Sequence, residues 1–131
     1  MNVAVLGASN KPERYSFQAV KRLAEKGHAV CPVHPALATI EGVPVFKQLG
    51  DIPVPLHTLT VYVGSERSAA LAAAILAARL QRVIFNPGAE NPVLAQQLQA
   101  AGIQVENTCT LVLLRTGQFD AASVADGAKW R

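Results

Sequence analysis

Short apolar runs and helical patterns alternate along the whole chain. The apolar runs are continuous rather than alternating, which indicates strands that are buried on both faces of a parallel sheet. The predicted strands are Asn2–Leu6, Ala29–Val33, Leu59–Val63, Arg82–Phe85 and Ile103–Glu106. Val43–Phe46 is predicted as a further short strand at the sheet edge, because Pro44 has no N–H group for a central ladder.

Helical spacing marks the segments between these strands. It predicts helices over 16–26, 65–80 and 92–101. Ser65 is predicted as the cap of the second helix, which is rich in alanine and can therefore lie close to a sheet. Asn91 and Pro92 are predicted as the N-cap and first residue of the third.

This alternation predicts an α/β fold with a doubly wound, Rossmann-like parallel sheet of strand order 3-2-1-4-5-6. We expect one domain over residues 1–131, with a weakly patterned tail over 120–131. In such a sheet a ligand binds at the carboxyl ends of the strands, where the order reverses. The segments predicted to reach this edge are 7–16, 33–35, 63–67 and 86–90.

Composition narrows the classes of function. Only 5% of the residues are aromatic and 16% are charged, and the net charge of +3 is spread along the chain. A nucleic-acid binder has clustered basic residues and exposed aromatics, so none is predicted here. The chain opens on a strand rather than a signal peptide and has no membrane-length apolar run, so we expect a cytoplasmic protein. Cys31 and Cys109 lack metal-site or redox spacing, and no metal is predicted.

The first strand leads into the strongest candidate site. A glycine turn at Gly7 is followed by a polar loop that contains Arg14 and opens a helix at about Ser16. This arrangement directs backbone N–H groups, hydroxyls and a guanidinium toward one point, which favours a phosphate.

The pattern departs from that of a dinucleotide site. Ser9 and Pro12 stand where the fingerprint has its second and third glycines. The segment 30–35 contains no carboxylate to hold the ribose of NAD, so a phosphorylated ribose would not be repelled there. The glycine-lysine pattern of ATP-hydrolysing proteins is absent as well.

In these features the sequence resembles the CoA-binding domain family, small Rossmann-like proteins related to the nucleotide-binding domain of succinyl-CoA synthetase alpha subunits. The resemblance runs from Val3 to about Phe119. It depends on the segments 5–9, 11–16, 27–35, 85–90 and 106–111 in this order and spacing.

The resemblance implies a site for coenzyme A or an acyl-CoA. It assigns Gly7, Ala8 and Ser9 to the diphosphate, and Arg14, Tyr15 and Ser16 to closure over phosphate. It assigns Val33, His34 and Pro35 to the adenosine, and Asn86, Pro87 and Gly88 to the pantetheine arm. Family members commonly have asparagine where this chain has His34.

No set of residues for catalysis can be assembled from the sequence. We therefore expect a stand-alone protein that binds CoA or acyl-CoA as a sensor or carrier. An alternative is a small enzyme that uses NAD(P), or an acyl-CoA transferase with Cys109 as nucleophile. A homodimer or a complex with a partner enzyme stays open.

Overall fold

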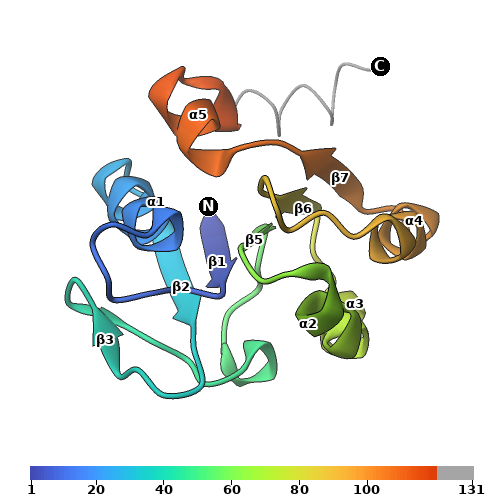
Figure 1. The fold of residues 1–131 in the computed structure, drawn as a ribbon, viewed down its shortest axis with the longest axis horizontal. Helices are drawn as coiled ribbons and strands as arrows, with labels where there is room; N and C mark the ends of the chain where they lie inside the picture. Colours follow the sequence, from blue (N-terminus) through green and yellow to red (C-terminus); the bar gives the residue numbers. More distant parts are fainter. Residues whose placement is uncertain (121–131) are drawn as a thin grey trace.

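A five-stranded parallel sheet forms the centre of the molecule (Figure 1). This computed structural model describes residues 1–120. The sheet order is β2-β1-β5-β6-β7, and every neighbouring pair is parallel. The strands are β1 (Asn2–Leu6), β2 (Ala29–Val33), β5 (Thr58–Val61), β6 (Arg82–Phe85) and β7 (Gln104–Asn107). The predicted fold class is confirmed, while the predicted tail lies almost wholly outside the described residues.

Helices cover both faces of this sheet (Figure 1). One face carries α1 (Tyr15–Glu25) and α5 (Thr110–Arg115); the other carries α2 (Ser65–Ala70), α3 (Ala72–Ala77) and α4 (Pro92–Ala100). Each face has its own hydrophobic core, and alternate residues of β1 pack into one or the other. Val3 and Val5 pack in the core beneath α1 and α5, and Ala4 packs in the core on the opposite face. Burial on both faces explains the continuous hydrophobicity of the strands. In the described residues no helix is both long and apolar enough to cross a membrane.

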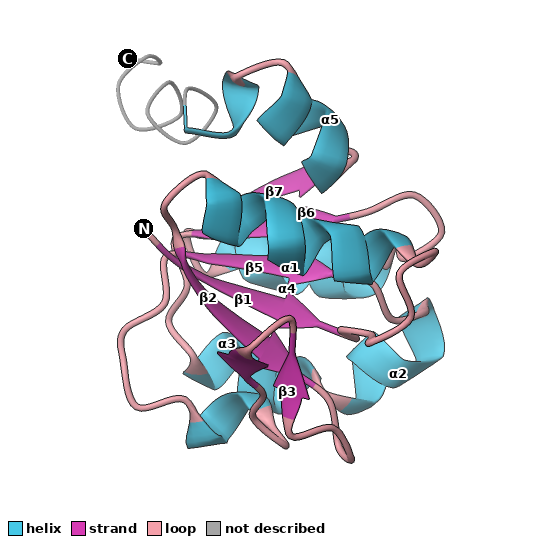
Figure 2. Cartoon of the chain, turned by 90° about the vertical axis from the view of Figure 1, so that its left-hand side faces the viewer, coloured by secondary structure: helices cyan, strands magenta, loops and turns pink. Residues whose placement is uncertain are grey.

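The predicted edge strand Val43–Phe46 is mostly wrong. Its first half, β4 (Val43–Pro44), pairs antiparallel with β3 (Thr39–Ile40) in a separate hairpin beyond the β2 edge (Figure 2). Only Phe46 reaches the main sheet, through one parallel bridge to Val33. The ladder stops there because Pro32 in β2 and Pro44 both lack an N–H group. A short 3-10 helix, η1 (Leu49–Asp51), follows.

The helix ends test the capping predictions. Asn91 caps α4 as predicted, with its side chain accepting a hydrogen bond from Leu94 N at 3.1 Å. The predicted cap Ser65 is wrong, since Gly64 is the N-cap and Ser65 already lies in α2. The predicted second helix is also interrupted at Leu71, whose N–H is shared between two preceding carbonyl groups.

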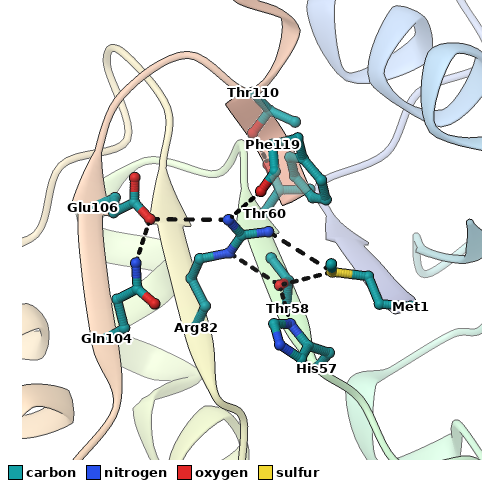
Figure 3. Close-up of polar contacts among 9 residues, drawn as sticks. All are labelled: Met1, His57, Thr58, Thr60, Arg82, Gln104, Glu106, Thr110 and Phe119. Atoms are coloured by element: carbon teal, nitrogen blue, oxygen red, sulfur yellow. Dashed lines mark hydrogen bonds and ion pairs between the residues drawn. The ribbon is translucent and has the colours of Figure 1, made fainter. Parts of the chain in front are cut away.

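A buried arginine closes the amino edge of the sheet (Figure 3). Arg82, the first residue of β6, is 0% exposed. Its Nε donates to Thr58 Oγ1 at 3.1 Å and its Nη1 to the Phe119 carbonyl at 2.8 Å. The guanidinium carbon also lies 4.3 Å from the centre of the Phe119 ring, and Glu106 is 3.9 Å from Nη1. Arg82 thus joins three strands to the segment that follows α5.

Candidate functional site

A cleft of about 930 Å³ lies at the carboxyl edge of the sheet. Its walls come from the β1–α1 loop, the end of β2, the segment around η1, and the residues from the end of β5 into α3. The strand order reverses between β1 and β5, so this is the place where doubly wound folds bind ligands. The volume is within the range of small-molecule and cofactor sites.

The β1–α1 loop forms the floor of the cleft. Gly7 has φ +87°, and a Cβ atom on it would lie 2.8 Å from Val63 Cγ1 and 3.2 Å from Val63 N. Only glycine fits this close approach. Two hydrogen bonds within the loop hold its shape: Ser9 Oγ accepts from Lys11 N at 3.0 Å, and Arg14 N donates to Lys11 O at 3.0 Å.

The amino end of α1 opens into the same cleft. Arg14 is the N-cap, and its side chain makes no capping bond. The N–H groups of the first helical turn have no acceptor within the helix, and the helix dipole makes this end positive. Ser16 is buried in that turn, whereas Tyr15 is 70% exposed at the mouth of the cleft. The backbone of this turn, Ser16 and Arg14 therefore all border one cleft.

Positive charge dominates the cleft. Among residues 1–120, its charged lining residues are the cations Lys11, Arg14, Lys47 and Arg67 and the carboxylate Asp51. Within residues 1–120 none of these cations takes part in an ion pair, and Asp51 accepts a hydrogen bond from Gln48 Nε2 at 3.3 Å. Unpaired cations on one concave surface attract a ligand with several negative charges.

The end of β2 forms a second wall through His34. The Nδ1 atom of His34 accepts hydrogen bonds from the backbone N–H groups of Ala36 at 2.9 Å and Leu37 at 3.2 Å. A neutral ring that accepts at Nδ1 carries its proton on Nε2. An asparagine would serve the turn in the same way, with its oxygen accepting and its NH₂ group left to donate. His34 therefore keeps one donor for a ligand although it differs from the family residue.

Tyr62 lines the cleft and was missed by sequence reasoning. Its hydroxyl oxygen is buried, and within the described residues it makes no hydrogen bond of ordinary geometry. Burial, followed by the nearness of Cys109, raises the pKa of Tyr62, while the Thr110 and Thr60 hydroxyls act in the opposite direction. Tyr62 is thus a neutral phenol. Tyr62 was not predicted as a cleft residue because the predicted strand extended to Val63, which placed Tyr62 inside a strand. In the structure β5 ends at Val61, one residue earlier.

The structure brings together nine of the twelve predicted residues. The cleft is lined by Gly7, Ala8, Ser9, Arg14, Tyr15, Ser16, Val33, His34 and Pro35. The turn Asn86, Pro87 and Gly88 does not line it. Two residues that were not predicted as site residues, Arg67 and Lys47, also line the cleft. Arg67 lies in a segment predicted to reach this edge. The sequence around Lys47 does not predict its place in the cleft, because that place depends on the bridge between Val33 and Phe46.

The side chain of Asn86 is used inside the protein. Asn86 is 2% exposed, and its Nδ2 donates to Thr60 Oγ1 at 2.7 Å and to the Val61 carbonyl at 2.9 Å. Its Oδ1 accepts from Thr110 N at 2.8 Å. Asn86 thus joins β5 and β6 to the start of α5. The N–H of Gly88 donates to Glu90 Oε1 at 2.9 Å, which holds the next turn.

Neither Cys31 nor Cys109 lines the cleft. Cys109, the N-cap of α5, lines a second groove of about 500 Å³ between α1 and α5. Tyr15 lines both the cleft and this groove. Cys31 is buried in β2, and burial raises the pKa of its thiol. In the part of the chain that the structure describes, no group of three or more His, Cys, Asp and Glu side chains could hold a metal ion.

The fold is a doubly wound α/β domain, and four of the five charged residues within 1–120 that line its cleft are cations. Comparison with known families agrees: the model of the CoA binding domain family matches residues 1–115. This chain belongs to that family. The resemblance that the sequence motifs suggested is confirmed.

Individual relatives extend this comparison. The chain is 31% identical over 65 residues to the uncharacterized protein YneT of Bacillus subtilis, an alignment that covers 50% of this chain and 48% of YneT. A crystal structure of an uncharacterized protein superposes with a TM-score of 0.84 at 32% identity, covering 90% of this chain and 97% of the other. A dinucleotide-forming acetyl-coenzyme A synthetase of Ca. Korarchaeum cryptofilum shares the fold, with a TM-score of 0.70 at 19% identity. There the match covers 82% of this chain and 25% of the synthetase.

Proposed function

We propose that this protein binds coenzyme A or an acyl-CoA in the cleft, as a cytoplasmic binding or sensor protein. The observation that carries the proposal is that four cations, none of them in an ion pair within residues 1–120, line the same cleft as the Gly7 turn and the amino end of α1. Coenzyme A has a diphosphate and a further phosphate on its ribose. Its charge therefore complements that of the cleft.

The cleft offers a distinct surface to each part of this ligand. The diphosphate would lie against the loop 7–16, where backbone N–H groups and Arg14 can donate to it. The adenosine would contact Val33, His34 and Pro35, with His34 Nε2 as donor. The pantetheine arm would leave past Tyr62 and Gly64. Membership of the CoA binding domain family supports coenzyme A as the ligand.

Isothermal titration with CoA and acetyl-CoA tests the proposal. We expect saturable heat with one ligand per chain, and little difference between the two ligands, because the acetyl group adds no charge. An absence of heat at millimolar ligand would overturn it.

Enzymatic alternatives have less support. The end of β2 still lacks a carboxylate for the ribose of NAD, and Cys109 lies in the groove rather than among the residues that line the cleft. A transferase with Cys109 as nucleophile would gain an acetyl mass on incubation with acetyl-CoA, and Cys109→Ser would abolish that gain. We expect no such adduct.

A further inference from the structure

Lys47 is held beside the end of β2 by backbone hydrogen bonds of its neighbour Phe46. Phe46 N donates to Pro32 O at 2.9 Å, and His34 N donates to Phe46 O at 2.9 Å. These two bonds fix the chain beside the last residues of β2. The segment therefore turns into the cleft at Lys47, although it is distant from β2 in sequence.

This position has a known role in dinucleotide-binding folds. A carboxylate at the end of the second strand holds the ribose hydroxyls of NAD, and an arginine nearby accommodates a ribose phosphate instead. Here the segment 30–35 has no carboxylate. Lys47 lines the cleft together with Val33 and His34, and it follows directly after the residue that bridges to Val33. A cation at this place favours a phosphorylated ribose.

The ammonium group of Lys47 is available for such a contact. Within residues 1–120 it takes part in no ion pair. Asp51 is the carboxylate on the same wall, and its Oδ1 accepts from Gln48 Nε2. The charge of Asp51 opposes a phosphate there, so its removal should strengthen phosphate binding rather than weaken it.

The other cations lie elsewhere in the cleft. Lys11 and Arg14 belong to the β1–α1 loop, and Arg67 belongs to α2. None of these three lies on the segment that Phe46 joins by hydrogen bonds to the end of β2. Lys47, on the segment beside β2, is placed for the nucleoside end of the ligand.

We propose that Lys47 binds the ribose phosphate of coenzyme A, so that the cleft selects 3′-phosphorylated adenine nucleotides over their unphosphorylated counterparts. This inference depends on the proposed function. Lys47 acts as a specificity-determining residue, and its effect is confined to ligands that carry the ribose phosphate.

Titration calorimetry with CoA and 3′-dephospho-CoA tests this assignment on the wild type, Lys47→Gln and Lys21→Gln. Lys21 is an exposed lysine of α1 that lines neither cavity, and it is the matched control. We expect the wild type to prefer CoA by about tenfold, as for one charge-assisted contact. Lys47→Gln should weaken CoA binding about tenfold and leave dephospho-CoA unchanged, whereas Lys21→Gln should change neither. Asp51→Asn should tighten CoA binding by about two- to threefold.

The outcomes separate the two proposals. If the wild type binds neither ligand, the proposed function fails. If it binds both equally, or if Lys47→Gln weakens both by the same factor, CoA binding stands and the role of Lys47 is overturned. A parallel titration with NADP⁺ and NAD⁺ identifies the source of the phosphorylated ribose. Tighter binding of NADP⁺ than of CoA, with the same dependence on Lys47, would overturn the assignment to CoA.

Discussion

The two edges of the sheet carry arginines in opposite states. At the amino edge, Arg82 is 0% exposed and bonded to Thr58 and the Phe119 carbonyl (Figure 3). At the carboxyl edge, Arg14 is exposed and has no ion-pair partner among residues 1–120. A guanidinium that its own protein satisfies stabilises the fold, whereas one that its protein leaves free can bind a ligand.

Burial sets the energetic difference between these arginines. Burial lowers the pKa of Arg82, while the carboxylates of Glu106 and Asp120 oppose this shift. A buried charge is tolerated only where hydrogen bonds and an opposite charge compensate for lost hydration. Arg14 keeps its hydration until a ligand replaces it. The two arginines should therefore respond to substitution in different measurements.

The largest expected effect is on stability at the amino edge. Arg82→Met removes the donor to Thr58 Oγ1 and to the Phe119 carbonyl, and leaves Glu106 without its cation. We expect the free energy of unfolding in urea to fall by about 3 kcal/mol, as for a broken buried pair. CoA affinity of the folded fraction should stay within about twofold, because Arg82 is at the edge opposite the cleft.

Arg22→Met is the control for this loss. Arg22 pairs with Glu25 at 3.0 Å on the surface of α1, and both side chains are half exposed. Such a pair contributes about 0.5 kcal/mol. Equal losses for the two variants would mean that Arg82 is no more than a surface charge, and the comparison of the edges would fail.

The next largest effect is expected for Asn86, a buried polar residue that follows β6 at the carboxyl edge of the sheet. Asn86→Ala leaves the Thr110 N–H without its acceptor and removes the donor to the Val61 carbonyl. We expect a loss of about 2 kcal/mol in unfolding free energy, with CoA affinity changed by less than about threefold. Thermal unfolding and titration on the same sample measure both quantities. A tenfold loss of affinity at unchanged stability would instead assign Asn86 to the ligand, as the sequence motif implies.

Arg14→Ala should lower CoA affinity with little change in stability, which is the reverse of the result expected for Asn86→Ala. The variant loses the proposed charge-assisted contact to phosphate, so CoA affinity should fall about tenfold, while the unfolding free energy stays within about 0.5 kcal/mol. Raising the salt concentration should reduce wild-type affinity more than that of the variant, because exposed charges are screened. Unchanged affinity would remove Arg14 from the site.

More of the geometry of the carboxyl edge than of the amino edge could be predicted from the sequence. The strand and the turn at Gly7 follow from local pattern, and so does the placement of Arg14 at the start of α1. Lys47 and Tyr62 could not be predicted in this way. Lys47 depends on a single bridge between distant segments, and Tyr62 on where β5 ends.

The burial of Arg82 could not be predicted from the sequence either. A single arginine at the start of an apolar run has no local mark of burial, and its partners Thr58, Glu106 and Phe119 come from three distant segments. Asn86 shows the converse difficulty. Its turn motif is typical of a ligand-lining loop, yet tertiary contacts occupy its side chain.

The smallest effect is the pH dependence of the amino edge. His28 and His57 both lie there, and burial lowers the pKa of each below its ordinary value of 6.5. Asp120, 3.3 Å from His28 Nε2, opposes the shift without reversing it. The unfolded chain therefore binds more protons than the folded protein, and stability should rise with pH through this range. The contribution is complete above about pH 6.5 and is lost as the pH falls toward the folded pKa values.

Urea unfolding at about pH 7.5 and about pH 5.5 measures this dependence. We expect lower stability at the acidic value, and His57→Gln should reduce the difference because the substituted side chain does not titrate. CoA affinity measured at about pH 7.5 should be the same in His57→Gln and the wild type, since His57 does not line the cleft. Greater stability in acid would mean that the ion pair between His28 and Asp120 outweighs burial. Protonation would then add a stabilising positive charge at the amino edge, whereas the proposed ligand brings negative charge to the cationic cleft.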